Sequence, residues 1–208
     1  MKKLAAVLLA ISAAFSLPLA AGEPKPAAKS AATATAIATF AGGCYWCVES
    51  DFDKVKGVVD TTSGFMGGHT ENPTYDEVSS GETGHTEVVR VTYDPSIVSY
   101  QTLLDAYWRN VDPTDGRGQF CDRGSQYRPA IFVYTGEQKA LAEASKTSLE
   151  KSHRFADPIA VEIHSASGFT PAKDQDFYKL SPVRYKFYRL GCGRDARLAQ
   201  LWGGNAGH

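Results

Sequence analysis

The sequence lacks several features that mark large classes of proteins. It contains neither a basic stripe nor an acidic block, and its 22 Lys and Arg nearly balance its 23 Asp and Glu. Because clustered positive charge is what meets the phosphates of nucleic acids, a nucleic-acid partner is not expected. No apolar run reaches the roughly 20 residues that cross a bilayer, and no internal repeat is visible. These absences favour a soluble domain without stable membrane association.

The first 22 residues have the pattern of a secretory signal peptide. A basic start is followed by an uncharged apolar run, Leu4–Leu19, and then by Ala20-Ala21-Gly22, which offers a cleavage site. The mature protein is therefore predicted to be exported, as a periplasmic or secreted protein, and a retained N-terminal anchor is the alternative. Removing the two lysines of the leader leaves 20 basic and 23 acidic residues, a net charge of −3.

The rest of the chain is predicted to be a linker and one domain. Residues 23–34 lack aromatic and large aliphatic side chains, so they cannot bury enough surface to offset the entropy of ordering. Residues 35–208, about 170 residues, have the length of a single domain. A monomer is the simplest assumption.

All four cysteines lie in the predicted domain, at Cys44, Cys47, Cys121 and Cys192. In an exported protein, two structural disulfides are the default interpretation. A domain of this size buries a full core without cross-links, however. The Cys44-x-x-Cys47 spacing is typical of redox enzymes and of metal sites, and it favours chemistry over structure.

Hydrophobic patterning predicts an α+β domain. Strand patterns occupy residues 37–40, 58–65, 85–93, 130–134 and 159–163. Helix patterns occupy residues 44–54, a segment after the cap Ser99, residues 135–152 after a Thr135/Gln138 capping box, and residues 195–202. Two long irregular loops, 66–84 and 111–129, and an irregular stretch at 164–194 separate them. This order favours two layers, with helices packed on a mixed or antiparallel sheet and a ferredoxin-like core.

Cys44 is the candidate nucleophile. It follows Gly42-Gly43 and opens a predicted helix, where unpaired backbone N–H groups and the helix dipole favour a thiolate. The two glycines allow a ligand to approach the backbone closely. Cys47 lies one helical turn further, so the two sulfurs are able to face each other. The alternative is a buried pair of cysteines without chemistry.

Glu87 is the candidate proton donor. On the alternating strand it shares a face with Val89, Val91 and Tyr93, which is predicted to be the core face. A carboxyl desolvated there holds its proton more tightly and serves as a general acid near neutral pH. The alternative is an edge position at which the side chain simply reaches solvent.

Further candidates lie in the two loops and beside the nucleophile. Tyr75, Asp122 and Tyr127 offer hydrogen-bonding groups from the loops, although most tyrosines of surface loops have no such role. Tyr45 and Trp46 flank Cys44 and either line an apolar pocket for a small methyl group or pack into the core.

Four spaced motifs together resemble methionine sulfoxide reductase A. They occur in the order of that family, between about Thr35 and Cys192, as Gly43-Cys44-Tyr45-Trp46-Cys47-Val48-Glu49, Asn72-Pro73-Thr74-Tyr75, Gly84-His85-Thr86-Glu87 and Asp122-Arg123-Gly124-Ser125-Gln126-Tyr127-Arg128. The family restores oxidised methionine. The sequence departs from the family pattern at Tyr45, where phenylalanine is more usual. The additional hydroxyl of Tyr45 needs a polar partner or water.

The resemblance implies a role for each matching residue. Cys44 would attack the sulfoxide sulfur, Glu87 would protonate its oxygen, and Tyr75 and Tyr127 would hydrogen-bond that oxygen. The substrate would be bound by Tyr45, Trp46 and Asp122, the first two around its methyl group and the last at its backbone. The substrate would be methionine sulfoxide, free or in proteins, as the S epimer.

The resemblance also implies how the enzyme is regenerated. A second thiol would condense with the sulfenic acid on Cys44, and an external thioredoxin-like dithiol would reduce the disulfide, without metal or organic cofactor. Cys192, which lies between glycines near the C-terminus, is the preferred resolving cysteine. Cys47 is the alternative and Cys121 a distant third.

Two other functions remain open at this point. A thioredoxin-like dithiol oxidoreductase would also be exported with a C-x-x-C motif, but it would not need Glu87. A metal-binding module would use Cys44 and Cys47 with His69 or His85. The sequence lacks the second close pair of ligands that is typical of zinc sites.

Overall fold

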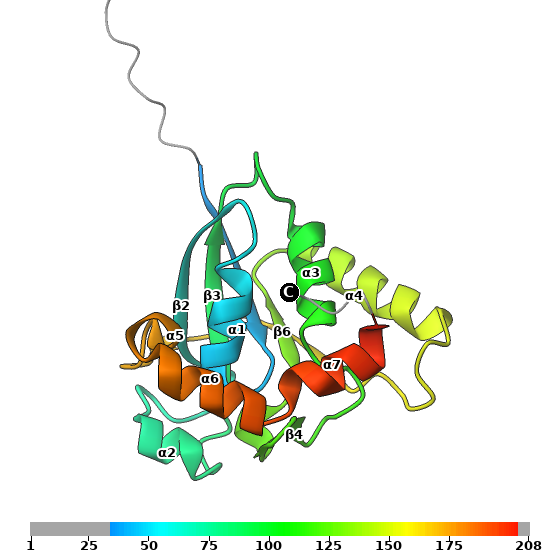
Figure 1. Cartoon of the computed structure of the whole chain (residues 1–208). Coiled ribbons are helices and arrows are strands. Elements are labelled where there is room, and N and C mark those ends of the chain that lie inside the picture. Colours follow the sequence, from blue (N-terminus) through cyan, green and yellow to red (C-terminus); the bar gives the residue numbers. More distant parts are fainter. Residues whose placement is uncertain (1–33, 204–208) are drawn as a thin grey trace, which may run out of the picture. The chain divides into compact units, whose positions relative to one another are not determined.

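The computed structural model describes residues 34–203, coloured in Figure 1. The predicted signal peptide at 1–22, the linker at 23–34 except for its last residue, and residues 204–208 lie outside this part. The strands are β1 (Ala36–Ala41), β2 (Val58–Met66), β3 (Thr86–Tyr93), β4 (Gly118–Gln119), β5 (Asp122–Arg123), β6 (Ala130–Val133), β7 (Glu162–Ser165) and β8 (Thr170–Pro171). The helices are α1 (Tyr45–Phe52), α2 (Tyr75–Ser79), α3 (Tyr100–Arg109), α4 (Gly136–Lys151), α5 (Phe177–Leu180), α6 (Pro182–Gly191) and α7 (Arg194–Trp202), with a 3-10 turn, η1 (Ser125–Tyr127).

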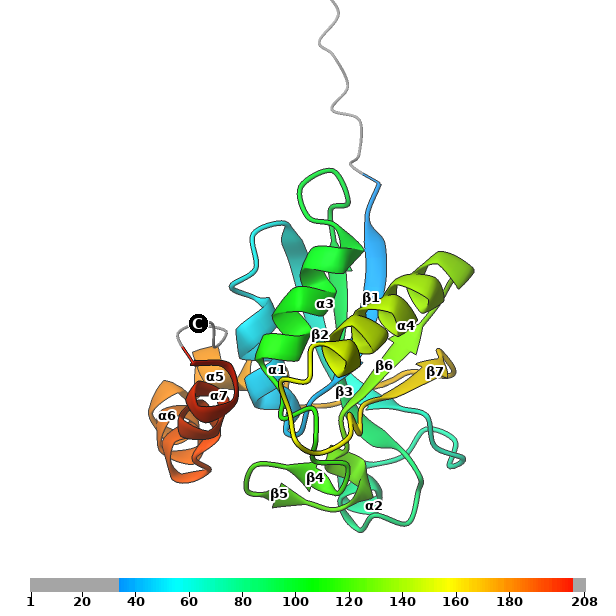
Figure 2. The same ribbon diagram turned by 90° about the vertical axis from the view of Figure 1, so that its right-hand side faces the viewer.

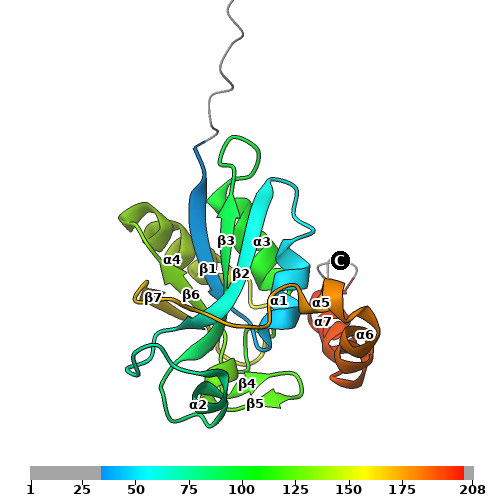
Figure 3. The ribbon, with the colours of Figure 1, turned by 90° about the vertical axis from the view of Figure 1, so that its left-hand side faces the viewer.

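A six-stranded mixed sheet forms one layer, with the order β7-β6-β1-β3-β2-β8. Neighbouring strands are antiparallel except β6 and β7, which are parallel. The segment β1-α1-β2-β3-α3-β6 gives the central order β6-β1-β3-β2, which is the ferredoxin-like arrangement. Figure 3 shows these strands with α3 and α4 behind them. The predicted α+β fold with helices on a mixed sheet is confirmed.

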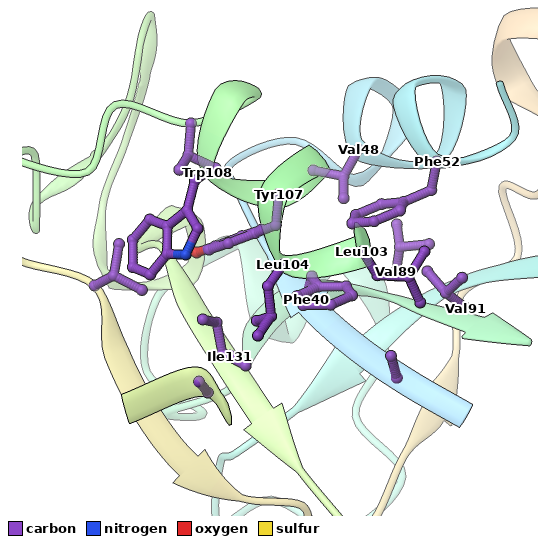
Figure 4. Packing of buried hydrophobic residues seen from close by; sticks show 14 of the residues in the cluster. Phe40, Val48, Phe52, Val89, Val91, Leu103, Leu104, Tyr107, Trp108 and Ile131 are labelled. Carbon is purple, nitrogen blue, oxygen red and sulfur yellow. The ribbon is translucent and has the colours of Figure 1, made fainter. Parts of the chain in front are cut away.

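The main core lies between the sheet and the helices α1, α3 and α4 (Figure 2). Figure 4 shows Phe40 of β1 at its centre, with its ring 4.8 Å from that of Phe52 and 5.1 Å from that of Tyr107. Leu103 and Leu104 of α3 pack fully buried beside them. Burying each side chain of this size stabilises the fold by roughly 1.5–3 kcal/mol, so this layer holds the ends of β1 and β3 in place.

Two helices begin at the capping residues that the sequence predicted. The hydroxyl of Ser99 accepts from the Thr102 N–H at the start of α3, and the hydroxyl of Thr135 accepts from the Gln138 N–H at the start of α4. The reciprocal contact of the predicted Thr135/Gln138 capping box, from the Gln138 side chain to the Thr135 N–H, is not formed, so this part of the prediction is wrong. The Gln138 carboxamide accepts from the Tyr134 N–H and donates to the Ile37 carbonyl, so it joins α4 to β1 instead of closing the cap.

The irregular stretches predicted at 66–84 and 164–194 are only partly irregular. Helix α2 lies in the first, where Thr74 and Glu77 form a capping box. Helices α5 and α6 and the short strand β8 lie in the second. Helix α6 was missed although its apolar residues Val183, Phe187 and Leu190 recur at helical spacing. In the structure this apolar stripe is exposed and does not face the core. None of the helices described here is long and apolar enough to span a bilayer.

Buried ion pairs hold the C-terminal helices against α1. Asp51 of α1 pairs with Arg189 of α6 at 2.9 Å and with Arg194 of α7 at 3.4 Å. Arg194, which is 2% exposed, also donates to the carbonyls of Gly42 and Asn110. Removing one member of a buried pair costs about 3–5 kcal/mol, because the other charge is left without a partner. These pairs fix α6 and α7 beside the turn that carries Cys44.

Candidate active site

Cys44 lies where β1 ends and α1 begins. It is the N-cap residue of α1, and its carbonyl accepts from the backbone N–H of Cys47 at 3.1 Å. Gly43 before it has φ +87°, a conformation that favours glycine, and a Cβ there would lie 2.7 Å from the Cβ of Gln119. The glycines were predicted to admit a ligand, but at Gly43 the adjacent space is filled by Gln119. The turn therefore serves packing.

Glu87 points into the core from β3, as the alternating pattern predicted. Its side chain is 3% exposed, and its Oε2 accepts from the Tyr45 N–H at 3.0 Å. Burial raises the pKa of Glu87 from its ordinary value to about 8, against the smaller, opposite effect of the Tyr45 N–H. The predicted desolvation is confirmed, and the carboxyl holds a proton at neutral pH.

The prediction of a stabilised thiolate at Cys44 is wrong for this structure. The side chain is 7% exposed, and burial raises the pKa of Cys44 well above its usual value. The neighbouring ionisable groups of Glu87 and Cys47 raise the pKa of Cys44 further. A helix of eight residues with one turn of N–H groups does not offset this desolvation. Cys44 and Glu87 are both protonated at rest.

Tyr75 and Tyr127 reach the same site from the two predicted loops. Tyr75 begins α2 and is 45% exposed, whereas Tyr127 ends η1 and is half-buried. Burial raises the pKa of each hydroxyl, and for both residues Glu87 and Cys44 raise the pKa further. The structure thus brings the four groups together, and the two hydroxyls remain protonated donors at neutral pH.

Asp122 lies on β5 close to the backbone of Cys44. Burial raises the pKa of Asp122, while a hydrogen bond from the Tyr188 hydroxyl and one from the Cys44 backbone N–H lower it. The carboxylate is thereby bound to the backbone of the nucleophile. Its predicted contact with the substrate backbone stays a prediction.

Tyr188 is a residue of the site that the sequence analysis missed. It comes from α6 and donates to Asp122, and its hydroxyl also lies near enough to the Cys44 thiol to lower the pKa of Cys44. The signal that would have found it is Ser181-Pro182, a helix start, followed by Tyr185, Tyr188 and Cys192 at spacings of three and four.

The two aromatic neighbours of Cys44 divide between core and site. Tyr45 is buried in the main core, with its ring 6.0 Å from that of Phe65. Trp46 is half-buried, stacks on Phe177 of α5 at 3.8 Å and meets the edge of the Tyr188 ring at 5.4 Å. Tyr45 thus packs into the core with its hydroxyl close enough to Glu87 for that carboxyl to raise its pKa, whereas Trp46 lies beside Cys44 and Tyr188 at the edge of the core. The predicted contact of both residues with the methyl group of the substrate stays a prediction.

The cysteines form two sets. Cys121 and Cys192 are joined by a disulfide, with their Cα atoms 4.9 Å apart, whereas Cys44 and Cys47 are free and buried. Burial raises the pKa of Cys47, and Arg194 and Arg189 lower it in part. The predicted resolving cysteine, Cys192, is thus paired with Cys121 in this structure.

The histidines considered for a metal site have other positions. His85 accepts from the Gly68 N–H and contacts the Thr70 carbonyl, so its ring holds the loop before β3. His69 lies beside Gly84 at the same loop. Within residues 34–203, three possible metal ligands come together at Cys121, Asp122 and Cys192. Both cysteines of this group are joined in the disulfide. The predicted cysteine–histidine set does not assemble.

Comparison with known proteins gives one consistent result. The family model described as peptide methionine sulfoxide reductase matches residues 36–206. The peptide methionine sulfoxide reductase MsrA of Bacillus licheniformis is 52% identical over 169 residues, which cover 80% of this chain and 93% of that protein. Methionine sulfoxide reductase A of Corynebacterium diphtheriae superposes with a TM-score of 0.63 at 32% identity, over 77% of this chain and 84% of that one. Reduced Mxr1 from Saccharomyces cerevisiae superposes with a TM-score of 0.67 at 27% identity, over 74% of this chain and 90% of that one.

Proposed function

The chain belongs to the peptide methionine sulfoxide reductase MsrA family, and from this premise we propose that it reduces methionine (S)-sulfoxide, free or within oxidised proteins, to methionine. One observation of the structure supports the proposal most directly. A carboxyl with its pKa raised to about 8, that of Glu87, lies beside the thiol of Cys44, and both groups influence the pKa values of the Tyr75 and Tyr127 hydroxyls. Such a set suits the attack of sulfur on a polar S–O bond.

In the proposed reaction, Cys44 attacks the sulfoxide sulfur while Glu87 gives its proton to the oxygen. The carboxylate that remains takes up the proton of the Cys44 thiol, so the raised pKa of the thiol does not block attack. Tyr75 and Tyr127 donate to the oxygen as charge develops on it. The oxygen passes to Cys44 as a sulfenic acid, and methionine leaves.

Trp46 and Tyr188 suit the binding of the methyl group of the substrate. The indole of Trp46 is held by the rings of Phe177 and Tyr188, so it presents a rigid apolar surface next to Cys44. The preference for the S epimer would follow from which side of the sulfur carries this methyl group. The sulfenic acid is then removed through a disulfide, which a thioredoxin-like dithiol reduces.

The alternative of a general dithiol oxidoreductase has less support. An enzyme that exchanges disulfides with protein substrates presents its C-x-x-C motif at the surface. Here Cys44 and Cys47 are both buried.

The function is tested with separate S and R epimers of methionine sulfoxide and dithiothreitol as reductant. We expect turnover of the S epimer alone, abolished by Cys44→Ser. Cys47→Ser is the matched control, because it removes the neighbouring buried thiol. Turnover of neither epimer, together with reduction of insulin disulfides, would favour the dithiol oxidoreductase instead.

We further propose that the protein acts outside the cytoplasm, since residues 1–22 have the pattern of a cleaved leader. The N-terminal sequence of the protein recovered from each cell fraction tests this. A periplasmic or secreted form that begins at residue 23 is the expected result, and an uncleaved cytoplasmic form would contradict it.

A further inference from the structure

Exposed apolar side chains gather on α5 and α6. Of the nine large apolar residues that are exposed within residues 34–203, four lie on these two helices, and each of the four is at least 62% exposed. They are Leu180 at the end of α5 and Val183, Phe187 and Leu190 of α6. The last three are spaced by four and three residues, so they lie on one side of α6. These four side chains are called the apolar ridge, and contiguous apolar surface of this kind marks a contact with a partner or a membrane.

The opposite side of α6 is bound to the body of the protein. Tyr188 donates to Asp122, and Arg189 forms a buried ion pair with Asp51. Figures 2 and 3 show α6 at the outer edge of the molecule. The apolar ridge therefore lies on the side of α6 that faces away from Tyr188 and from the proposed active site.

The charged residues beside the apolar ridge are all basic. Residues 177–193 include no Asp or Glu, and their basic residues are Lys179, Arg184, Lys186 and Arg189. The first and last of these pair with carboxylates, whereas Arg184 and Lys186 are exposed and form no ion pair with any residue of the part that the structure describes. Helical geometry places Arg184 on one side of the apolar ridge and Lys186 on the other. The ridge thus has a free cation on each side.

We propose that the apolar ridge docks the protein on the surface of an anionic lipid bilayer. The four apolar side chains enter the boundary between headgroups and acyl chains, while Arg184 and Lys186 stay at the level of the lipid phosphates. The charges favour this partner over a second copy of the chain, because a symmetric contact between two ridges brings the cations of both copies together without a carboxylate between them. A lipid surface also accepts a protruding helix without a matching groove.

The proposed contact is peripheral and reversible. Helix α6 has ten residues, far fewer than the roughly 20 that span a bilayer. Its attachment depends on the buried apolar area and on the attraction of two cations to anionic lipid acting together. The sequence analysis predicted no stable membrane association, and a contact of this size is transient. The docking goes beyond the proposed reaction and does not depend on it.

Cosedimentation with vesicles tests the apolar part of the contact. The protein as recovered from cells is mixed with vesicles of phosphatidylglycerol and phosphatidylcholine in equal parts, or of phosphatidylcholine alone. We expect binding to the anionic vesicles that weakens as salt is added. Phe187→Ser combined with Leu190→Ser should lower the partition coefficient about tenfold or more, because two apolar side chains no longer enter the lipid. Val59→Ser combined with Ile97→Ser is the matched control, since it removes two exposed apolar residues elsewhere, and it should bind like the parent.

A second pair of variants tests the charges. Arg184→Gln combined with Lys186→Gln should lower binding to the anionic vesicles roughly tenfold. Lys139→Gln combined with Lys151→Gln removes the same charge from the exposed side of α4 and should bind like the parent. All variants carry the N-terminus of the parent, so the leader contributes equally to each measurement. Circular dichroism shows that each variant is folded.

Three results would overturn the proposal. The first is a parent that does not bind the anionic vesicles, and the second is equal binding of the parent and the Phe187→Ser, Leu190→Ser variant. The third is a parent that sediments as a dimer and becomes monomeric in that variant, which would assign the apolar ridge to a second copy. None of these measurements involves methionine sulfoxide, so a failure of the proposed function would leave the lipid binding unchanged.

Discussion

Two buried glutamates, one on helix α1 and one that accepts a hydrogen bond from its first residue, differ in what they face. Glu87 on β3 is 3% exposed and Glu49 on α1 is 0% exposed. Burial raises the pKa of Glu87 to about 8 and that of Glu49 to about 7. Both are desolvated carboxyls with a raised pKa, the usual mark of a catalytic acid.

Their surroundings separate them. Glu87 accepts from the Tyr45 N–H and lies beside the Cys44 thiol. Glu49 faces Ser63 and the backbone of Asp176, which lower its pKa slightly, although no hydrogen bond of ordinary geometry reaches either of its oxygens. A raised pKa therefore reports burial in both residues, whereas the neighbouring nucleophile marks only Glu87 as a catalytic candidate.

The largest expected difference between the two glutamates is in catalysis. Glu87→Gln removes the proposed proton donor, so kcat/KM should fall by roughly 10²–10⁴-fold, the usual contribution of a general acid. Glu49→Gln should leave kcat/KM close to that of the parent, because its carboxyl touches no group of the proposed site. Equal losses in the two variants, measured on methionine (S)-sulfoxide with dithiothreitol, would remove the distinction.

The next expected difference is in the pH dependence of stability. A carboxyl with a raised pKa in the folded protein binds a proton that the unfolded chain gives up, so its stabilising effect is full below pH 4.5 and is lost as pH rises through the folded pKa. The free energy of unfolding of the parent should fall between pH 4.5 and about 7 on account of Glu49, and up to about 8 on account of Glu87.

Urea unfolding of glutamine variants across this range separates the two contributions. Glu49→Gln should lose the part of the slope below about pH 7, and at pH 8 it should be more stable than the parent by up to roughly 3 kcal/mol. Glu87→Gln should lose the part that extends to about pH 8. Glu150→Gln on the exposed side of α4 is the control, and it should keep the slope of the parent. A slope unchanged in Glu49→Gln would show that its carboxyl is ionised in the fold.

The sequence predicted one of these glutamates and not the other for a physical reason. Glu87 stands out because period-two alternation places it on the face of Val89 and Val91, so its burial follows from the strand alone. Glu49 lies on a short helix that is buried all round, where no polar face marks its side chains. Its burial depends on α5, which packs on α1 and was not predicted.

The same reason limits what the sequence revealed of the site. Cys44, Glu87, Tyr75, Tyr127 and Asp122 were all proposed from local patterns and motifs, and the structure brings them together. Tyr188 was not, because it lies on α6, a helix whose apolar residues point to solvent and whose inner face carries Tyr188 and Arg189. The spacing of Tyr185, Tyr188 and Cys192 indicates the helix, but it does not show which distant groups these side chains contact.

Tyr188→Phe tests that contact and carries the smallest of the expected effects on catalysis. The Tyr188 hydroxyl lowers the pKa of Cys44 and binds Asp122, so its loss should raise the pKa of Cys44 further and reduce kcat about tenfold, the effect of one hydrogen bond to a charged group.

Tyr185→Phe is the matched control, since Tyr185 lies one turn earlier on α6 and hydrogen-bonds Cys47 instead. Both variants are compared by their kcat and by the pH dependence of Cys44 alkylation with iodoacetamide. A shift of the alkylation profile to higher pH in Tyr188→Phe alone would show that the nucleophile, unlike Cys47, is tuned from the C-terminal helix. The same profile in both variants would place the control of its pKa entirely with burial and Glu87.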